Sequence, residues 1–136
     1  MDTLSRLDRS RRMALVKNKG TRPEIAVRKA VSKLGHRYRL HKATLPGKPD
    51  LVFSSSKKVI FVHGCFWHRH PHCPRNRTPK SRLEFWIPKL KSNRARDKKN
   101  IARLSKMGWN VLVVWECDSE KPKPLIRTLR KFLAKR

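Results

Sequence analysis

Acidic residues are scarce in this sequence. Its 136 residues include 36 lysines and arginines but only 9 aspartates and glutamates, so the formal net charge at pH 7 is +27. A field of this sign attracts polyanions and repels other basic molecules. Nucleic acid is therefore the first partner to consider, and an anionic membrane surface is the second. A passive packing protein of the ribosomal or chromatin type would suit the same composition, so charge alone does not indicate an enzyme.

Long apolar runs and cysteines are also few. The longest apolar runs, such as residues 59–62 and 111–115, fall far short of the roughly 20 residues that a membrane-spanning helix needs. The first residues lack the apolar segment of a secretory signal. Three cysteines are an odd number, which does not suit a disulfide framework. We therefore expect a cytoplasmic, nucleoid-associated protein whose cysteines are free thiols or metal ligands.

Apolar periodicity predicts an α/β fold with a mixed central sheet flanked by helices. Residues 1–20 are typical of a basic N-terminal arm with a short helix, and residues 21–136 of a single domain. A capping box at Thr21 and Glu24 should open a helix that ends near Leu34, before Gly35.

The remaining predicted elements follow in chain order. They are an edge strand (36–41), a hairpin of two strands (48–53 and 58–63), a long loop (64–80), a short helix from Ser81 that Pro88 breaks or kinks, a second helix ending at Met107, a strand covered on both faces (109–115) and a basic helix (121–135).

Asp50 is the most suggestive of the few acids. It stands at the start of a predicted strand, close in sequence to Lys48, Lys57 and Lys58. A carboxylate held in basic surroundings can bind Mg²⁺, a hard cation that prefers oxygen ligands and substrate phosphates. An ordinary Pro-Asp turn is the alternative.

The loop that follows the second hairpin strand is rich in cysteine and histidine. Thiolates and imidazoles are ligands that select zinc over Mg²⁺. Cys65, His70, Cys73 and Cys117 would complete a tetrahedral Cys₃His set, which is typical of a structural zinc site. His72 could replace His70 as the ligand, and Cys117 alone could equally be a buried apolar residue.

There are two aromatic pairs here: Phe66-Trp67 lies inside this loop, and Phe85-Trp86 lies in the short predicted helix that follows it. Such rings can stack on bases or wedge between base pairs, or they can fill a small core beneath the loop. We expect Trp67 and Trp86 to be exposed and Phe85 to be in the core.

Several motifs together resemble the very-short-patch-repair mismatch endonucleases. They are Leu45-Pro46-Gly47-Lys48-Pro49-Asp50, Val62-His63-Gly64-Cys65-Phe66-Trp67-His68, Glu84-Phe85-Trp86, Asn93, Asp97 and Trp115-Glu116-Cys117. The resemblance runs from about Arg11 to Cys117. It implies a restriction-endonuclease-like fold, a variant of the PD-(D/E)xK type, with a structural zinc site. It also implies a Mg²⁺-dependent nickase that cuts beside the T of a T:G mismatch left by deamination of 5-methylcytosine, and so starts very-short-patch mismatch repair.

The resemblance also implies roles for individual residues. Asp50 would bridge two Mg²⁺ ions, with the backbone carbonyl of Val62 as a further ligand. His68 would be the general base, oriented by Glu24, and His63 would stabilise the scissile phosphate or a metal-bound water.

The same resemblance extends to the zinc and DNA contacts. It implies one structural zinc ion on Cys65, His70, Cys73 and Cys117. The residues implied to contact DNA are the intercalating Phe66, Trp67, Trp86 and Met13, then Asn93, with the basic Lys48 and Arg94 beside them.

The sequence departs from the family pattern in three places, one of which is the second histidine, His72, that could replace His70 as the zinc ligand. Val62 stands where Thr is expected, which is harmless if only its carbonyl binds metal. The strand after Pro49-Asp50 lacks the Glu-x-Lys of ordinary restriction-type nucleases. Two rival interpretations remain: a restriction-type or mobile-element endonuclease of the same fold, and a non-catalytic, zinc-ordered nucleic-acid-binding protein. The expected partners are double-stranded DNA with a T:G mismatch and mismatch-repair proteins, with the chain a monomer and no membrane involved.

Overall fold

The computed structural model describes residues 21–77 and 79–134. The N-terminal arm expected over residues 1–20, including Met13, therefore lies outside the described residues. The described elements, in chain order, are α2 (Arg22–Lys33), β1 (Arg39–Leu40), β2 (Leu51–Phe53), β3 (Lys58–His63), α3 (Leu83–Lys106), β4 (Asn110–Trp115), α4 (Glu116–Ser119) and α5 (Pro122–Ala134).

The four described strands form one mixed sheet in the order β1-β2-β3-β4. β1, β2 and β3 are successive antiparallel neighbours, whereas β4 runs parallel to β3. A parallel pair needs a crossover connection, and α3 supplies it. The predicted hairpin and the predicted mixed sheet are both confirmed.

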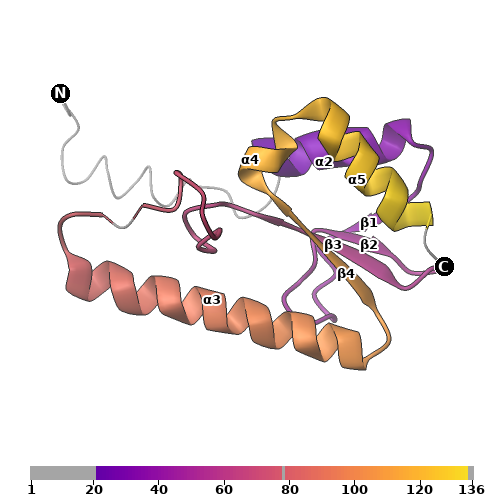
Figure 1. Ribbon diagram of the computed structural model, residues 1–136. Helices are drawn as coiled ribbons and strands as arrows, with labels where there is room; N and C mark the ends of the chain where they lie inside the picture. Colours follow the sequence, from indigo (N-terminus) through magenta and orange to yellow (C-terminus); the bar gives the residue numbers. More distant parts are fainter. Residues whose placement is uncertain (1–20, 78, 135–136) are drawn as a thin grey trace.

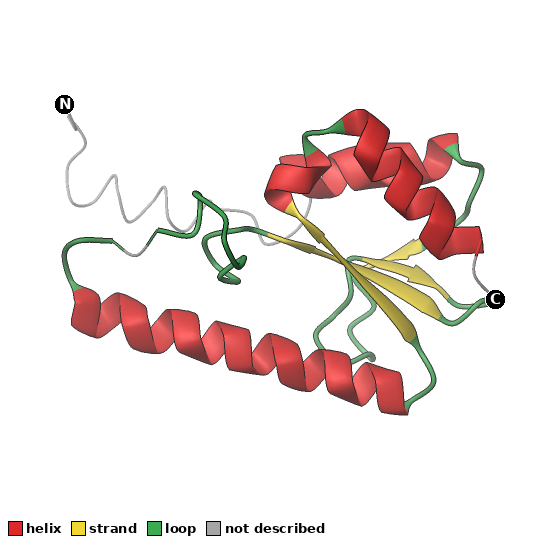
Figure 2. Cartoon of the chain, in the orientation of Figure 1, coloured by secondary structure: helices red, strands yellow, loops and turns green. Residues whose placement is uncertain are grey.

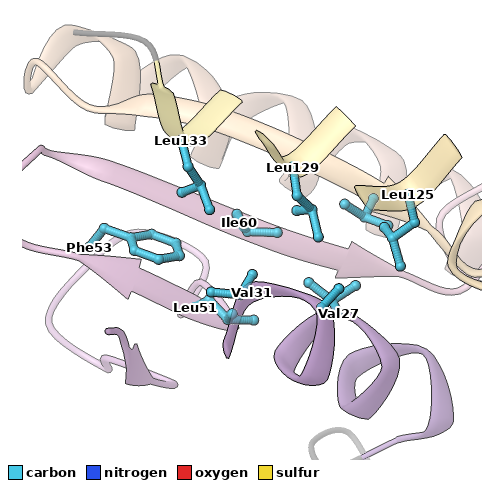
Figure 3. Close-up of a cluster of buried hydrophobic side chains, with 10 residues drawn as sticks. Val27, Val31, Leu51, Phe53, Ile60, Leu125, Leu129 and Leu133 are labelled. Carbon is cyan, nitrogen blue, oxygen red and sulfur yellow. The ribbon is translucent and has the colours of Figure 1, made fainter. Parts of the chain in front are cut away.

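Helices cover both faces of the sheet (Figures 1 and 2). α2 and α5 lie on one face, where Leu125, Leu129 and Leu133 of α5 point toward Ile60 of β3 (Figure 3). These leucines are four residues apart and so share one side of the helix. α3 covers the other face through Leu104, which packs in a cluster with residues of β2 and β3.

Helix α2 begins and ends as the sequence predicts. The hydroxyl of Thr21 accepts a hydrogen bond from the backbone N–H of Glu24 at 3.4 Å. Leu34 caps the carboxyl end, and Gly35 follows in the left-handed conformation with φ 85°. This start places Glu24 at the beginning of the helix, where its side chain is buried.

Helix α3 differs from the prediction, because it is one helix rather than two. It runs through Pro88 and begins after Arg82, not with a side-chain cap from Ser81. Proline removes one backbone N–H, which would have bonded to the carbonyl of Glu84. Glu84 lies on an exposed turn, where water can satisfy that carbonyl, so the helix continues.

Two strands also differ from the prediction. The edge strand expected over residues 36–41 is reduced to Arg39–Leu40. β4 was expected to be covered on both faces, but only Val114 is buried along it. β4 is the last strand in the order of the described sheet, so one long side has no described neighbour and its residues keep partial exposure.

Among the described residues, no helix is both long enough and apolar enough to cross a membrane.

Candidate active site

Asp50 lies immediately before β2 and is anchored to β3. Leu51 pairs with Ile60 in the antiparallel register, which brings the preceding residue beside the carboxyl end of β3. There the backbone N–H of Val62 donates a hydrogen bond of 2.6 Å to Oδ2 of Asp50. The sheet itself therefore orients this carboxylate.

A second carboxylate, Glu24 of α2, lies beside Asp50. The candidate ligand atoms of Glu24, His41 and Asp50 all lie within 4.8 Å of one another. Burial raises the pKa of Asp50 to about 7, and the charge of Glu24 adds to the rise, while the hydrogen bond from Val62 opposes it. Two carboxylates this close repel each other when ionised unless a cation joins them. Their oxygen atoms suit a hard divalent cation.

The contacts described for the side chain of Glu24 are with His41 and Arg28. Its Oε1 accepts a hydrogen bond of 2.7 Å from Nε2 of His41, and its Oε2 lies 3.6 Å from a guanidinium nitrogen of Arg28. These contacts do not test the expectation that Glu24 orients His68, which stays a prediction. His41, the residue that donates to Oε1 of Glu24, directly follows β1.

The partner of His68 is Asp97. Nδ1 of His68, in the loop after β3, lies 2.5 Å from Oδ2 of Asp97, on α3. A carboxylate accepts only, so Nδ1 carries the proton of this bond. The neutral ring then keeps its lone pair on Nε2, where it can accept a proton. This pair has the arrangement of a general base and the group that orients it.

His63, the last residue of β3, stacks on His68. The two ring centroids are 3.9 Å apart and the rings are inclined by 7°. Burial, with the neighbouring His68, lowers the pKa of His63 to about 4, so this imidazole is neutral near pH 7. Parallel stacked rings have their lone pairs in parallel planes and do not aim at one ion. The pair therefore suits hydrogen bonding and proton transfer better than shared metal binding.

These groups line two adjoining hollows. One, of about 410 Å³, is bordered by Lys48, His63 and Asp97. The other, of about 560 Å³, is bordered by Glu24 and Trp67. Asp50, Val62 and His68 line both hollows, so they form the wall between them. An extended polymer lying across this wall could contact the carboxylates and the histidines together.

The cysteine and histidine cluster assembles at the base of the loop after β3. Nδ1 of His70 lies 3.6 Å from Sγ of Cys65 and 3.4 Å from Sγ of Cys117, and Sγ of Cys73 lies 4.0 Å from Sγ of Cys117. Tetrahedral zinc with bonds of about 2.3 Å to sulfur places its sulfur ligands about 3.8 Å apart. The cluster could therefore hold one metal ion. His72 is exposed and lies outside the cluster, so the geometry selects His70.

Charged groups fix the surroundings of the cluster. Arg75 makes two hydrogen bonds to the carboxylate of Glu120, at 3.0 and 2.6 Å, and Glu116 accepts one from the backbone of Cys65 at 3.3 Å. Burial raises the pKa of the Cys65 thiol to about 12, whereas a backbone hydrogen bond from Arg75 lowers that of Cys73. A buried thiol of this kind ionises only when a cation joins it.

The aromatic pairs form one cluster between the loop and the start of α3. The ring of Phe66 packs edge-on against Trp67 and Trp86, at centroid distances of 5.1 and 5.5 Å. Trp67 and Trp86 are half-buried because they pack on each other, rather than fully exposed as expected. Phe85 is 44% exposed, so its prediction as a core residue is wrong. It lies on the exposed first turn of α3, where its ring packs edge-on against Trp86 and the cationic groups of Arg82 and Lys89 lie over it.

Of the polar residues expected to contact DNA, Asn93 lies beside this cluster. Asn93 of α3 donates a hydrogen bond of 3.4 Å to the backbone carbonyl of Trp67 and so ties the loop to the helix. Lys48 and Arg94 are exposed, and Lys48 borders the hollow at Asp50.

Comparison with known proteins decides the family. Residues 1–75 match the family described as DNA mismatch endonuclease Vsr. The chain belongs to the Vsr family. It is 40% identical to the DNA mismatch endonuclease Vsr of Escherichia coli over 116 residues, which cover 85% of this chain and 74% of that protein.

Relatives named as nicking enzymes are similar along most of their length. The chain is 48% identical to the Type II nicking enzyme V.XorIIP of Xanthomonas oryzae pv. oryzae, over 97% of this chain and 96% of that protein. It is 44% identical to the Type II nicking enzyme V.NmeAIP of Neisseria meningitidis, over 86% of this chain and 83% of that protein. This Vsr-family chain is therefore an endonuclease, and a nuclease family implies a divalent metal.

Three residues at this Vsr-family site received no role from the sequence. His41 follows a short exposed strand and gave no signal. Asp97 was among the residues of the resemblance, but nothing along the chain linked it to His68. Trp115 ends β4, where its ring stacks on His70 at 4.2 Å and lies edge-on to His63 at 5.4 Å. It forms the wall between the cysteine cluster and the histidine pair.

Proposed function

We propose that this chain is a Mg²⁺-dependent DNA endonuclease that nicks one strand at a T:G mismatch left by deamination of 5-methylcytosine, and so initiates very-short-patch mismatch repair. The names of its relatives support the mismatch and the nick. The observation that carries the proposal is that Asp50 and the His68–Asp97 pair line the same hollow. A metal-binding carboxylate and an oriented base within one hollow are the groups that hydrolysis of a phosphodiester requires.

The proposed roles follow from the contacts. Asp50, with the backbone carbonyl of Val62, would hold two Mg²⁺ ions. Bound there, the ions would supply Lewis-acid stabilisation of the charge that develops on the phosphate and the leaving oxygen. His68 would take the proton of the attacking water on Nε2, while Asp97 holds its Nδ1–H. His63, neutral beside it, would hydrogen-bond the scissile phosphate.

The aromatic cluster would recognise the mismatch. We assign Phe66, Trp67 and Trp86 to a wedge between base pairs, with Met13 entering the duplex as well. A mismatched pair costs less to unstack than a matched one, so a wedge favours damaged duplex. Asn93 would support recognition by holding the wedge loop on α3.

Affinity for the duplex would come from the basic surface. Lys48 and Arg94 are two of its exposed cations, and contacts of this kind bind phosphates without reading sequence. We propose a monomer that acts in the cytoplasm on the nucleoid, with mismatch-repair proteins as partners. Residues 21–136 would form one restriction-endonuclease-like domain, a variant of the PD-(D/E)xK type, with zinc on the cysteine cluster.

The mismatch specificity has a direct test. With Mg²⁺, the purified protein should nick one strand of a duplex with a single T:G mismatch and spare the matching T:A duplex, as seen on a denaturing gel with each strand labelled in turn. A panel of flanking sequences defines the context. Equal cutting of the two duplexes would contradict the mismatch proposal. Cutting of both strands would favour a restriction-type or mobile-element endonuclease. If neither strand is cut, the result would favour a non-catalytic binding protein.

The role of Asp97 has a separate test. Asp97→Asn should lower kcat by on the order of 10²- to 10⁴-fold with little change in KM, because an amide can donate to Nδ1 and so leave the proton of His68 on Nε2. Single-turnover nicking measures the rate. Asp118→Asn, the same change at an exposed aspartate of α4, serves as the control. Wild-type kcat in Asp97→Asn would exclude the proposed pair.

A further inference from the structure

We propose that His41 is a positioning residue that fixes Glu24 beside Asp50, so that both carboxylates face the same divalent metal ion. This inference rests on the proposed Mg²⁺-dependent function. It gives Glu24 a place at the metal, through a histidine that neither the sequence motifs nor the family resemblance singled out.

His41 is tied to both carboxylate residues at once. Its backbone N–H donates to the carbonyl of Asp50 at 3.2 Å, and its ring Nε2 donates to Oε1 of Glu24 at 2.7 Å. Its φ of 48° lies in the left-handed region, which residues with side chains rarely adopt. Such a conformation persists at functional sites where surrounding contacts enforce it. Here the two bonds hold the turn and direct the ring toward Glu24.

Each carboxylate has its own orienting donor. Val62 holds Asp50 at 2.6 Å, and His41 holds Glu24 at 2.7 Å. The distance from His41 Nε2 to Oδ1 of Asp50 is 3.9 Å, which is beyond a hydrogen bond. The ring of His41 therefore fixes Glu24 without making a hydrogen bond to the carboxylate of Asp50. Partners that orient metal ligands in this way affect metal affinity strongly, with a loss of about 10- to 100-fold when they are removed.

Arg28 provides a contrast on the same carboxylate. It lies 3.6 Å from the other oxygen of Glu24, and its side chain is 34% exposed, whereas that of Glu24 is 2% exposed. The separation of 3.6 Å is longer than a hydrogen bond of good geometry, so Arg28 holds this carboxylate less closely than His41 does at 2.7 Å. If Glu24 needed only a positively charged neighbour, Arg28 would position its carboxylate as well as His41 does.

A matched pair of amide substitutions tests the inference. In His41→Gln the amide nitrogen reaches about as far as Nε2, whereas in His41→Asn it is one carbon shorter and cannot reach Glu24. Asparagine also tolerates the left-handed backbone, so loss of the turn is not a complication. The measurement is calorimetric titration of the full-length protein with Mn²⁺ in the absence of DNA, with Asp50→Asn as the baseline for binding elsewhere.

We expect His41→Asn to weaken Mn²⁺ binding at the Asp50 site by about 10-fold or more, and to raise the Mg²⁺ concentration for half-maximal nicking by a similar factor. His41→Gln and Arg28→Gln should stay within about 3-fold of wild type. In a double-mutant cycle the effect of His41→Asn should disappear when Glu24→Gln is already present, because His41 acts through that carboxylate.

The experiment distinguishes a failure of the role proposed for His41 from a failure of the proposed function. Wild-type Mn²⁺ affinity in His41→Asn, with binding still lost in Asp50→Asn, overturns the role of His41 alone. An undiminished effect of His41→Asn in the Glu24→Gln background does the same. Wild-type Mn²⁺ binding in Asp50→Asn, or nicking that needs no divalent metal, overturns the proposed function itself. Far-ultraviolet circular dichroism of each variant identifies any that fails to fold, and the Glu24→Gln single variant then reports on the contact from its other end.

Discussion

Replacing Asp50 with asparagine should abolish nicking and, at the same time, make the metal-free protein more stable above pH 7. The amide keeps an oxygen to accept the hydrogen bond from Val62 but loses the charge that holds a divalent ion. Metal ions contribute several kcal/mol to stabilising a transferring phosphate, so the rate should fall by on the order of 10³-fold or more. The stability gain has a separate cause, which is the burial of this carboxylate.

The sign of the stability change follows from the pKa of Asp50. Its value is 3.8 in an unperturbed group and about 7 in the folded protein, so the folded state binds more protons between these limits. Unfolding then releases a proton, and stability falls as pH rises from about 4 to 7. Asp50→Asn removes this penalty. The free energy of unfolding of the variant should exceed that of wild type by on the order of 2 kcal/mol above pH 7, and should differ little from it at pH 4.

Thermal melts in a chelator measure this gain. At pH 8 the melting temperature of Asp50→Asn should exceed that of wild type by roughly 5 to 10 °C, and the difference should shrink toward pH 4. Asp118→Asn makes the same chemical change at an exposed site and should show no such pH dependence. Added Mg²⁺ should stabilise wild type and not the variant. A variant that melts below wild type at pH 8 would contradict the electrostatic explanation, and one that nicks normally would contradict the metal role.

The hairpin that carries Asp50 could be predicted because its signals are local. Continuous apolar runs on either side of a short turn predict β2 and β3. Their antiparallel register brings Asp50 and His63 to the same end of the sheet. The helix cap at Thr21 is likewise a local pattern. Local patterns gave the wrong prediction where exposure to solvent, or a position at the edge of the sheet, decides the structure. Pro88 is tolerated on an exposed turn, and β4 has no described neighbour on one side.

The partners of the site residues could not be read along the chain. Asp97 and His68 are 29 residues apart, and they meet only because α3 crosses from β3 to β4. His41 meets Glu24 only because the end of β1 comes beside α2. The sequence carries the types of group that a nuclease needs, but which carboxylate orients which histidine depends on tertiary packing. The bond between Asp97 and His68 is a consequence of that dependence.

The cysteine cluster should control both the stability and the activity of the enzyme. We expect metal analysis to find about one zinc ion per chain, held by Cys65, His70, Cys73 and Cys117. Structural zinc contributes ~10 to 16 kcal/mol of apparent binding energy in small peptides. Cys117→Ser should therefore lower the free energy of unfolding by roughly 3 kcal/mol or more. It should also expose the loop after β3 to proteolysis.

Two histidines in the same loop separate ligation from general loop damage. His70→Ala should lose zinc and reduce nicking, whereas His72→Ala, exposed and outside the cluster, should do neither. Activity should fall with zinc because the ring of His70 stacks on Trp115, whose edge contacts His63. A freed His70 leaves Trp115 without its stacking partner, and His63 then loses a wall that keeps it against His68. A fully folded, zinc-free wild type, or zinc loss in His72→Ala alone, would refute this ligand set.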